Sequence, residues 1–205
     1  MPTNLNQREY RSMSMMQPVD GEEFRVNGYA TTFDDPYVLY EDRDVVVREV
    51  ISHDVLADAD TRDVIMQYDH EGRVFARTSN GTLTIEPDAH GLAVSADLGG
   101  TDLGRGLFQE IKGGYTTKMS WAFTVADGGD EWKSEMAPDG RSLETRTIRR
   151  IRKVYDVSAV SLPANDATEI SARYLSDGVI ARIQEERLKE LELRKRKMLM
   201  EEKLK

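Results

Sequence analysis

The chain has 205 residues, of which 39% are hydrophobic, and a formal net charge of −9. This length suits one folded domain with an appendage, and the acidic balance argues against a nucleic-acid-binding protein, because such proteins normally present a basic face. The chain lacks both a run of roughly 20 apolar residues and a basic-then-apolar N-terminal segment, so we expect a soluble protein that neither spans a membrane nor is secreted. The absence of cysteine excludes disulfides, thiol nucleophiles and thiolate zinc sites, and three histidines are too few for a histidine-rich metal centre. We therefore expect no metal and no cofactor.

The first 21 residues are polar and rich in methionine, without a regular hydrophobic period, and are interpreted as a flexible N-terminal arm. Strands are then predicted over residues 24–33 and 44–51, the second rich in valine. The turn-forming residues Asp34-Asp35-Pro36 are expected to connect them. The fold is thus predicted to begin with strands.

An apolar strand is predicted over residues 64–68, directly before His70. A side chain in this place is fixed by the strand and left accessible by the loop that follows. Residues 73–78, 82–86 and 92–98 continue the β pattern, with Asn-Gly and Pro-Asp turn signals between them. The first half of the chain is therefore predicted to be almost entirely β.

One short helix is predicted over residues 101–111. Thr101 is a suitable N-cap, apolar residues follow at helical spacing, and Gly113-Gly114 ends the pattern. Together with the strands, this predicts a mainly β protein with few helices.

The segment over residues 118–125 alternates as a strand, with Met119, Trp121 and Phe123 on one face. Ser120 then lies on the opposite face of a rigid element, where its hydroxyl could serve as a nucleophile in a cleft. Most strand serines instead face solvent or bond to the backbone, so the pattern alone makes Ser120 a candidate and no more.

Residues 127–141 combine glycine and proline with charges and are predicted to form a hairpin tip or mobile loop. Long strands are expected to resume over residues 143–162, where a run of Arg149, Arg150, Arg152 and Lys153 is interpreted as a solvated strand face. A short edge strand is predicted over residues 169–174. From residue 176 the composition changes to a charged tail without a regular heptad, which favours a solvated helix or docking arm.

Several short motifs follow one another in a recognisable order. They are Gly28-Tyr29-Ala30 with Phe33, Glu49-Val50-Ile51, His70, Gly91-Leu92, Gly113-Gly114 before Ser120-Trp121-Ala122-Phe123, and Asp156-Val157-Ser158-Ala159-Val160 with Pro163-Ala164-Asn165. Over residues 22–174 this order resembles the tailed-phage prohead maturation proteases. The resemblance implies a herpesvirus-protease-like β-barrel, here bounded as a domain over residues 22–175, after an arm over 1–21 and before a helical tail over 176–205.

The same resemblance implies a serine endopeptidase that cleaves scaffold and capsid precursor segments, and its own chain, during prohead maturation. Its substrates would be the major capsid protein precursor and the scaffold segment. It would work as a homodimer in the host cytoplasm, inside the immature capsid, without nucleic acid, membrane or cofactor.

Carried over onto this sequence, the family's histidine falls on His70 and its serine on Ser120. Asp156 stands where an acidic residue precedes the Val-Ser strand, in place of the more usual glutamate and one methylene shorter. The resemblance implies that Ser120 attacks the peptide carbonyl, that His70 is the base and that Asp156 orients it. The large residues beside Ser120 depart from the family, in which smaller residues or glycine are frequent.

Three features of the predicted site have alternatives: the third member of the triad, the role of Asp156 and the donors to the oxyanion. His90 is a second candidate for the third member, because herpesvirus-type sites use a second histidine. Asp156 could instead pair with an arginine, and Ser158 and Ser161 share its strand without a histidine tied to them by pattern. The hydrogen-bond donors that stabilise the oxyanion are expected near Gly113-Gly114 or in the arginine run.

Two other classes of protein are also compatible with parts of the sequence. A non-catalytic capsid-assembly scaffold or binding protein would explain the charged tail and the acidic balance. A small-ligand β-barrel would need an apolar cavity lining, of which the charged, turn-rich segments give no sign.

Overall fold

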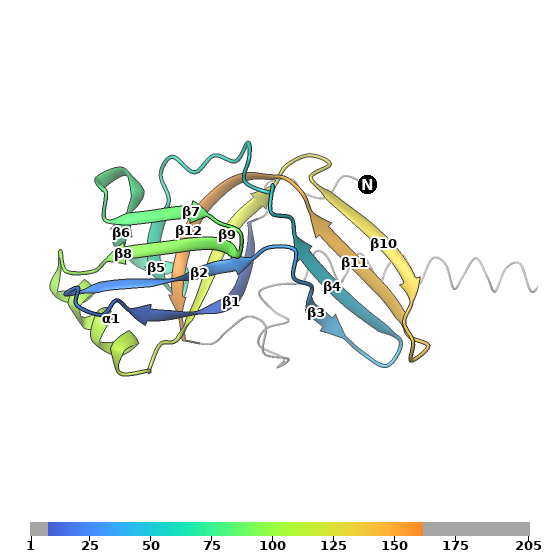
Figure 1. Cartoon of the computed structure of the whole chain (residues 1–205), viewed down its shortest axis with the longest axis horizontal. Coiled ribbons are helices and arrows are strands. Elements are labelled where there is room, and N and C mark those ends of the chain that lie inside the picture. Colours follow the sequence, from blue (N-terminus) through green and yellow to red (C-terminus); the bar gives the residue numbers. More distant parts are fainter. Residues whose placement is uncertain (1–7, 162–205) are drawn as a thin grey trace, which may run out of the picture.

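The computed structural model describes residues 8–161. The predicted edge strand over 169–174, the Pro163-Ala164-Asn165 motif and the helical tail from residue 176 lie outside the described residues. The described elements, shown in chain order in Figure 1, are β1 (Glu9–Pro18), β2 (Arg25–Thr32), β3 (Tyr37–Glu41), β4 (Val45–Ile51), β5 (Ile65–Tyr68), β6 (Glu71–Arg77), the 3-10 turn η1 (Thr78–Asn80), β7 (Leu83–Pro87), β8 (Gly91–Asp97), α1 (Asp102–Lys112), β9 (Lys118–Val125), β10 (Asp130–Met136), β11 (Ser142–Ile148) and β12 (Ile151–Val160).

The strands form two sheets. An eight-stranded sheet has the order β6-β5-β12-β9-β1-β2-β8-β7, and a four-stranded sheet has the order β10-β11-β4-β3. In Figure 1 the smaller sheet lies to the right and β12 curves from it into the larger sheet. In the described part of the chain, each edge strand has a hydrogen-bonded neighbour on one side only, whereas a barrel needs its first and last strands to pair. The mainly β class is confirmed, and the predicted closed barrel is wrong for the described residues.

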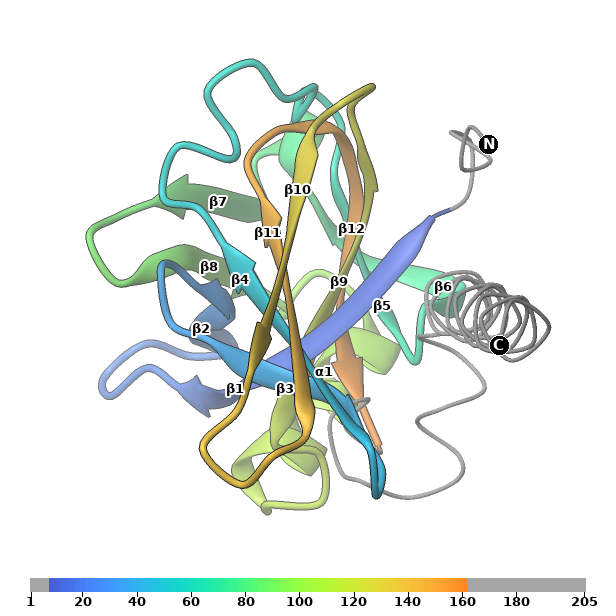
Figure 2. The same ribbon diagram turned by 90° about the vertical axis from the view of Figure 1, so that its right-hand side faces the viewer.

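Strand β1 lies inside the larger sheet, between β9 and β2. Its first part pairs antiparallel with β9 and its last three residues pair with β2. The prediction of a flexible arm over residues 1–21 is therefore wrong for β1. The segment has no regular hydrophobic period, and it becomes a strand because it pairs with β9 on one side and β2 on the other. Figure 2 shows this strand running through the middle of the molecule.

Two further strands were missed, and both are edges of the smaller sheet. β3 follows the predicted turn at Asp34-Asp35-Pro36, and β10 lies within the predicted loop over 127–141. β10 is largely exposed and carries charges of both signs, so it has little apolar pattern to reveal it. Its pairing along the whole length of β11 makes it a strand.

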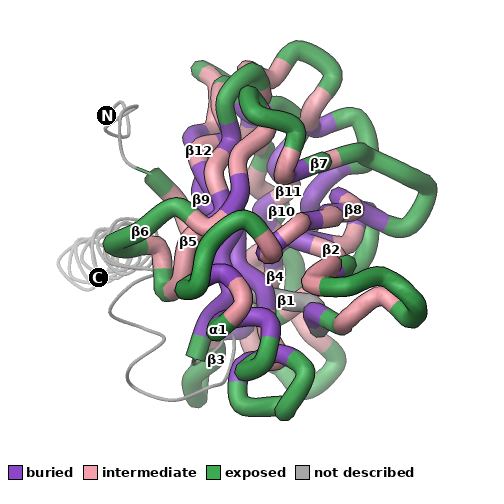
Figure 3. The backbone as a smooth tube through the Cα atoms, turned by 90° about the vertical axis from the view of Figure 1, so that its left-hand side faces the viewer, coloured by how far each residue is buried: buried purple, intermediate pink, exposed green. Residues whose placement is uncertain are grey.

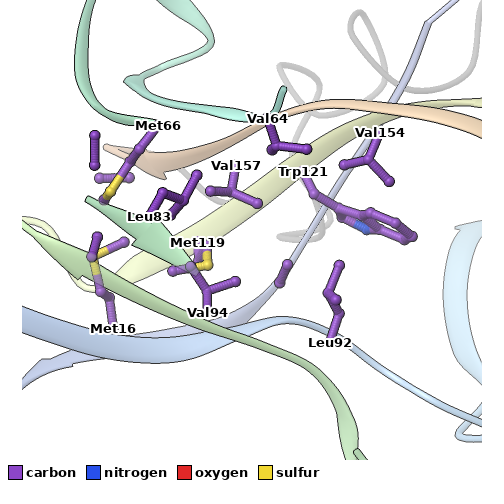
Figure 4. Packing of buried hydrophobic residues seen from close by; sticks show 14 of the residues in the cluster. Met16, Val64, Met66, Leu83, Leu92, Val94, Met119, Trp121, Val154 and Val157 are labelled. Carbon is purple, nitrogen blue, oxygen red and sulfur yellow. The ribbon is translucent and has the colours of Figure 1, made fainter. Parts of the chain in front are cut away.

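The core lies between the sheets and under α1. Trp121 and Phe123 of β9 are fully buried with their rings tilted at 4.4 Å between centroids, and Val154 and Val157 of β12 are buried beside them. Figure 4 shows Trp121, Val154 and Val157 together, and in Figure 3 the buried segments concentrate on the central strands.

Helix α1 forms where the sequence predicts it. The Thr101 side chain accepts a hydrogen bond from the backbone N–H of Gly104 at 2.9 Å, which caps the first turn. Leu107, Phe108 and Ile111 bury the apolar face of the helix in the core. Among the described residues, no helix is both long and apolar enough to cross a membrane.

A buried cluster of charges joins the two sheets. Arg11 of β1 is fully buried and makes two hydrogen bonds to Glu49 of β4, Nε to Oε1 at 2.5 Å and Nη2 to Oε2 at 2.8 Å. Arg146 of β11 reaches Glu49 at 3.1 Å and Glu9 at 2.5 Å, and the Tyr37 hydroxyl also donates to Glu49. Because a buried charge is costly without partners, this mutual pairing fixes β1 against the smaller sheet.

Candidate active site

Ser120 lies near the start of β9, in the middle of the larger sheet. Its neighbours in the flanking strands are Ser12 of β1 and Ser158 of β12. Directly opposite residues of antiparallel strands lie on the same face, so Ser120 and Ser158 share a face that is opposite to Trp121. This agrees with the predicted alternation. The face is covered, because only 2% of Ser120 is exposed.

His70 comes from the tight turn between β5 and β6. Tyr68 pairs with Glu71, which leaves only Asp69 and His70 in the turn. Both have positive φ, 48° for Asp69 and 60° for His70. Because β5 lies beside β12, and β12 beside β9, the turn places the imidazole over the strands that carry Asp156 and Ser120.

The three predicted site residues are brought together. His70 Nε2 lies 2.7 Å from Ser120 Oγ, and His70 Nδ1 lies 2.5 Å from Asp156 Oδ1. Of the side chains, 15% of His70 and 3% of Asp156 are exposed. The imidazole thus bridges a hydroxyl and a carboxylate through its two nitrogens, in a site that is largely withdrawn from water.

Asp156 is held by its own strand as well as by His70. It lies opposite Ala122 in β9 and beside Ile65 in β5, so it occupies a central position of the sheet. Ser158 Oγ donates a hydrogen bond of 3.0 Å to Asp156 Oδ1. The side-chain partners of Asp156 are thus His70 and Ser158, and the alternative pairing with an arginine is not seen among the described residues.

Tyr10 of β1 forms another side of the site. Its ring meets the His70 imidazole edge-on, with 4.6 Å between centroids and 65° between the planes. Tyr10 is paired with Ala122, which is also the partner of Asp156, so the three share one row across β1, β9 and β12. Sequence reasoning missed Tyr10 because β1 was not recognised as a strand.

The alternative residues lie elsewhere. His90 lies in the turn between β7 and β8, where its ring meets that of Tyr29, and this hairpin lies at the opposite edge of the sheet from His70. His53 bridges Asp34 and Asp54 at 3.0 Å each and is mostly exposed.

The arginine run lies at the far end of β12 from Ser158. Arg149 pairs with Glu131, and Arg150 donates to the backbone oxygens of Asp127 and Gly128. Arg150 precedes Ser158 by eight positions, or about 26 Å along an extended strand. Gly113-Gly114, in contrast, lies in the connection between α1 and β9, which leads into the end of β9 that carries Ser120.

This geometry suits nucleophilic catalysis. A serine hydroxyl within hydrogen-bond reach of an imidazole that a carboxylate orients is the arrangement that activates serine for attack on a carbonyl. In the described part of the chain, no group of three or more acidic, histidine or cysteine side chains is placed to hold a metal ion.

The comparison with protein-family models agrees with this chemistry. The model of the family described as caudovirus prohead serine protease matches residues 11–180, which is most of the chain and includes all three site residues. No curated protein and no solved structure matches the chain. On the extent of the family match, the chain belongs to the caudovirus prohead serine proteases.

Proposed function

We propose that Ser120, His70 and Asp156 are the catalytic triad of this serine protease, and that it cleaves peptide bonds through an acyl-enzyme. The observation that carries the proposal is the continuous chain of contacts from Ser120 Oγ through the two nitrogens of His70 to Asp156 Oδ1, at 2.7 and 2.5 Å. The family match supports the reaction type.

In the resting state, Asp156 accepts a hydrogen bond from Nδ1–H of His70, which leaves the lone pair of Nε2 facing the Ser120 hydroxyl. Ser120 Oγ attacks the peptide carbonyl carbon while Nε2 takes its proton, and the paired carboxylate stabilises the imidazolium. The imidazolium then returns the proton to the leaving amine as the C–N bond breaks, and an ester of Ser120 remains.

Water completes the cycle. Nε2 of His70 removes a proton from the water as its oxygen attacks the ester carbonyl, and the proton passes to Ser120 Oγ as the acyl group leaves. The enzyme is restored, and the products are a free carboxylate and a free amine. His70 thus carries out every proton transfer in this reaction cycle.

The substrates that we propose are the scaffold segment and the major capsid protein precursor, together with the enzyme's own chain. A prohead protease works on capsid precursors, which supports this choice. We further propose that it acts as a homodimer inside the immature capsid in the host cytoplasm. A non-catalytic scaffold role would require none of the His70 contacts.

A fluorophosphonate probe tests the triad. We expect it to label Ser120 in the full chain, and we expect Ser120→Ala and His70→Ala to abolish labelling while the thermal melt is retained. Ser95→Ala, a serine of β8 in the same sheet, and His90→Ala are the matched controls and should label like the wild type. Labelling that persists in Ser120→Ala at the same site would overturn the assignment.

Co-expression tests the substrates. The wild-type chain and Ser120→Ala would each be expressed with the capsid precursor and scaffold proteins, and the fragments identified by mass spectrometry. We expect defined fragments only with the wild type. Identical fragments in both would assign the cleavage to another protease.

A further inference from the structure

We propose that Asp69 is a positioning residue that locks His70 into its working orientation, through a latch between Asp69 and Ser161. The inference rests on the proposed function, because it gives Asp69 a role only if His70 is the base. It starts from an unusual backbone. Two consecutive residues other than glycine, Asp69 and His70, have positive φ.

The second residue of the turn is not the one that this conformation prefers. A two-residue hairpin turn with positive φ at both positions prefers Asn-Gly or Asp-Gly. Aspartate and histidine both occur at positive φ more often than most residues, but the second position of this turn prefers glycine, and His70 stands there. Such a backbone persists when its surroundings hold it in place.

Asp69 stabilises the turn through hydrogen bonds to β12 and to the residue that follows it. Its backbone N–H donates to the carbonyl of Ala159 at 2.9 Å. Its Oδ1 accepts from the backbone N–H of Ser161 at 2.9 Å, and its Oδ2 accepts from the Ser161 hydroxyl at 2.8 Å. Three hydrogen bonds from one residue thus tie the turn to the end of β12.

The latch joins the two strands that the site needs in register. β5 runs parallel to β12, with Tyr68 beside Ala159, and β12 carries Asp156. A turn that moved relative to the end of β12 would move the His70 ring away from both Asp156 and Ser120. The side-chain hydrogen bonds recorded for Asp69 both go to Ser161, so Asp69 acts on the site through the backbone of its neighbour.

Three variants of the full chain separate the latch from other roles. Asp69→Gly accommodates the positive φ but removes both acceptor oxygens. Asp69→Asn tolerates the same φ and keeps an acceptor oxygen for the Ser161 N–H, but removes the charge. Asp88→Gly is the matched control, because Asp88 accepts from two backbone N–H groups in the hairpin between β7 and β8, at the other edge of the sheet.

The readouts are the rate of fluorophosphonate labelling at Ser120, kcat and KM for a peptide substrate, and the thermal melt. We expect Asp69→Gly to lower the labelling rate and kcat by about 10- to 100-fold, with KM unchanged, because misplacing a catalytic group weakens the chemical step. Asp69→Asn should recover most of this loss, and Asp88→Gly should match the wild type.

Ser161→Ala keeps the proposal testable should Asp69→Gly fail to fold, since Ser161 is exposed and only one bond of the latch is lost. We expect it to slow labelling by about 2- to 5-fold. Wild-type rates in Asp69→Gly or in Ser161→Ala would overturn the latch, and equal losses in Asp69→Asn and Asp69→Gly would assign the effect to charge instead. A wild-type chain that is not labelled at Ser120 would overturn the proposed function itself, and the latch with it.

Discussion

Ser158 donates a hydrogen bond to Asp156, its second neighbour along β12, at 3.0 Å, and the accepting oxygen is the one that faces His70. A carboxylate oxygen with two donors is restricted in its rotation about the side-chain bond. Ser158 is fully buried, and it lies opposite Ser120 in the register of β12 and β9. The strand that carries Asp156 therefore also carries a hydroxyl that restrains its carboxylate.

Removing this hydroxyl should weaken the site without disturbing the fold. We expect Ser158→Ala to lower kcat/KM by about fivefold, which corresponds to one hydrogen bond of about 1 kcal/mol. The rate of probe labelling at Ser120 measures the effect, and the melting temperature controls for stability. A labelling rate equal to that of the wild type would show that Asp156 needs no help from Ser158.

Asp156→Asn should have the larger effect. An asparagine amide cannot stabilise the imidazolium and favours the wrong tautomer of His70, and the loss of the orienting acid costs about 10⁴-fold in kcat in a well-characterised triad. We expect a loss of this order in kcat with the fold intact. Normal cleavage by Asp156→Asn would show that His70 needs no carboxylate partner.

The buried charge cluster predicts a stability effect away from the site. Arg11→Met would leave Glu49 buried with fewer cationic partners, and breaking a buried pair from one side costs about 3 to 5 kcal/mol. Urea unfolding measures the change in the free energy of unfolding. The control is Arg62→Met, whose pair with Asp60 is exposed and should change stability by less than about 1 kcal/mol. Equal effects would argue that the cluster is not important for stability.

The Glu9 carboxylate makes the free energy of unfolding depend on pH. Burial raises its pKa, but the hydrogen bond from Arg146 and the charges of Arg11 and Arg146 outweigh burial and lower the pKa from 4.5 to about 2. A lowered pKa contributes stability that is complete above pH 4.5 and is lost as the pH falls toward 2.

Comparison with Glu9→Gln isolates this contribution. Between pH 7 and pH 3, the wild type should lose about 2 kcal/mol more of its free energy of unfolding than Glu9→Gln does. Urea unfolding at the two pH values is the measurement. Glu131→Gln, which removes an exposed partner of Arg149, should keep the behaviour of the wild type. The same loss in the wild type and in Glu9→Gln would contradict the lowered pKa.

Two glycines of α1 form a matched pair. A Cβ at Gly104 would lie 2.2 Å from the carbonyl oxygen of Leu98, whereas a Cβ at Gly106 would meet open space. Gly106→Ala should therefore stabilise the protein by about 0.5 to 1 kcal/mol through helix propensity. Gly104→Ala should destabilise it, because backbone must shift to admit the methyl group. Thermal melts of the two variants check the opposite signs.

The elements that the sequence predicts well are those whose signals are local. The alternation in β8 and β9, the valine-rich β4 and the cap of α1 at Thr101 each depend on residues close together in the chain. His70 and Ser120 were candidates on the same grounds, since each follows or lies within a strongly patterned strand. For Asp156, the order of motifs was needed as well.

The tertiary structure decided what depends on partners far along the chain. β1 and β10 have no clear apolar period and become strands through pairing with β9 and β11. The turn at Asp69-His70 was hidden because the next strand was predicted to begin at Arg73 and not at Glu71.

The meeting of the site residues depends in the same way on strand order. His70 and Asp156 are 86 positions apart, and His70 and Ser120 are 50 apart, so their contacts require β5, β12 and β9 to be adjacent. Periodicity reports which face of a segment is buried, but the choice of neighbouring strand follows from the packing of the whole domain. The sequence alone therefore determined the types of residue available for the chemistry, and the sheet decided that they touch.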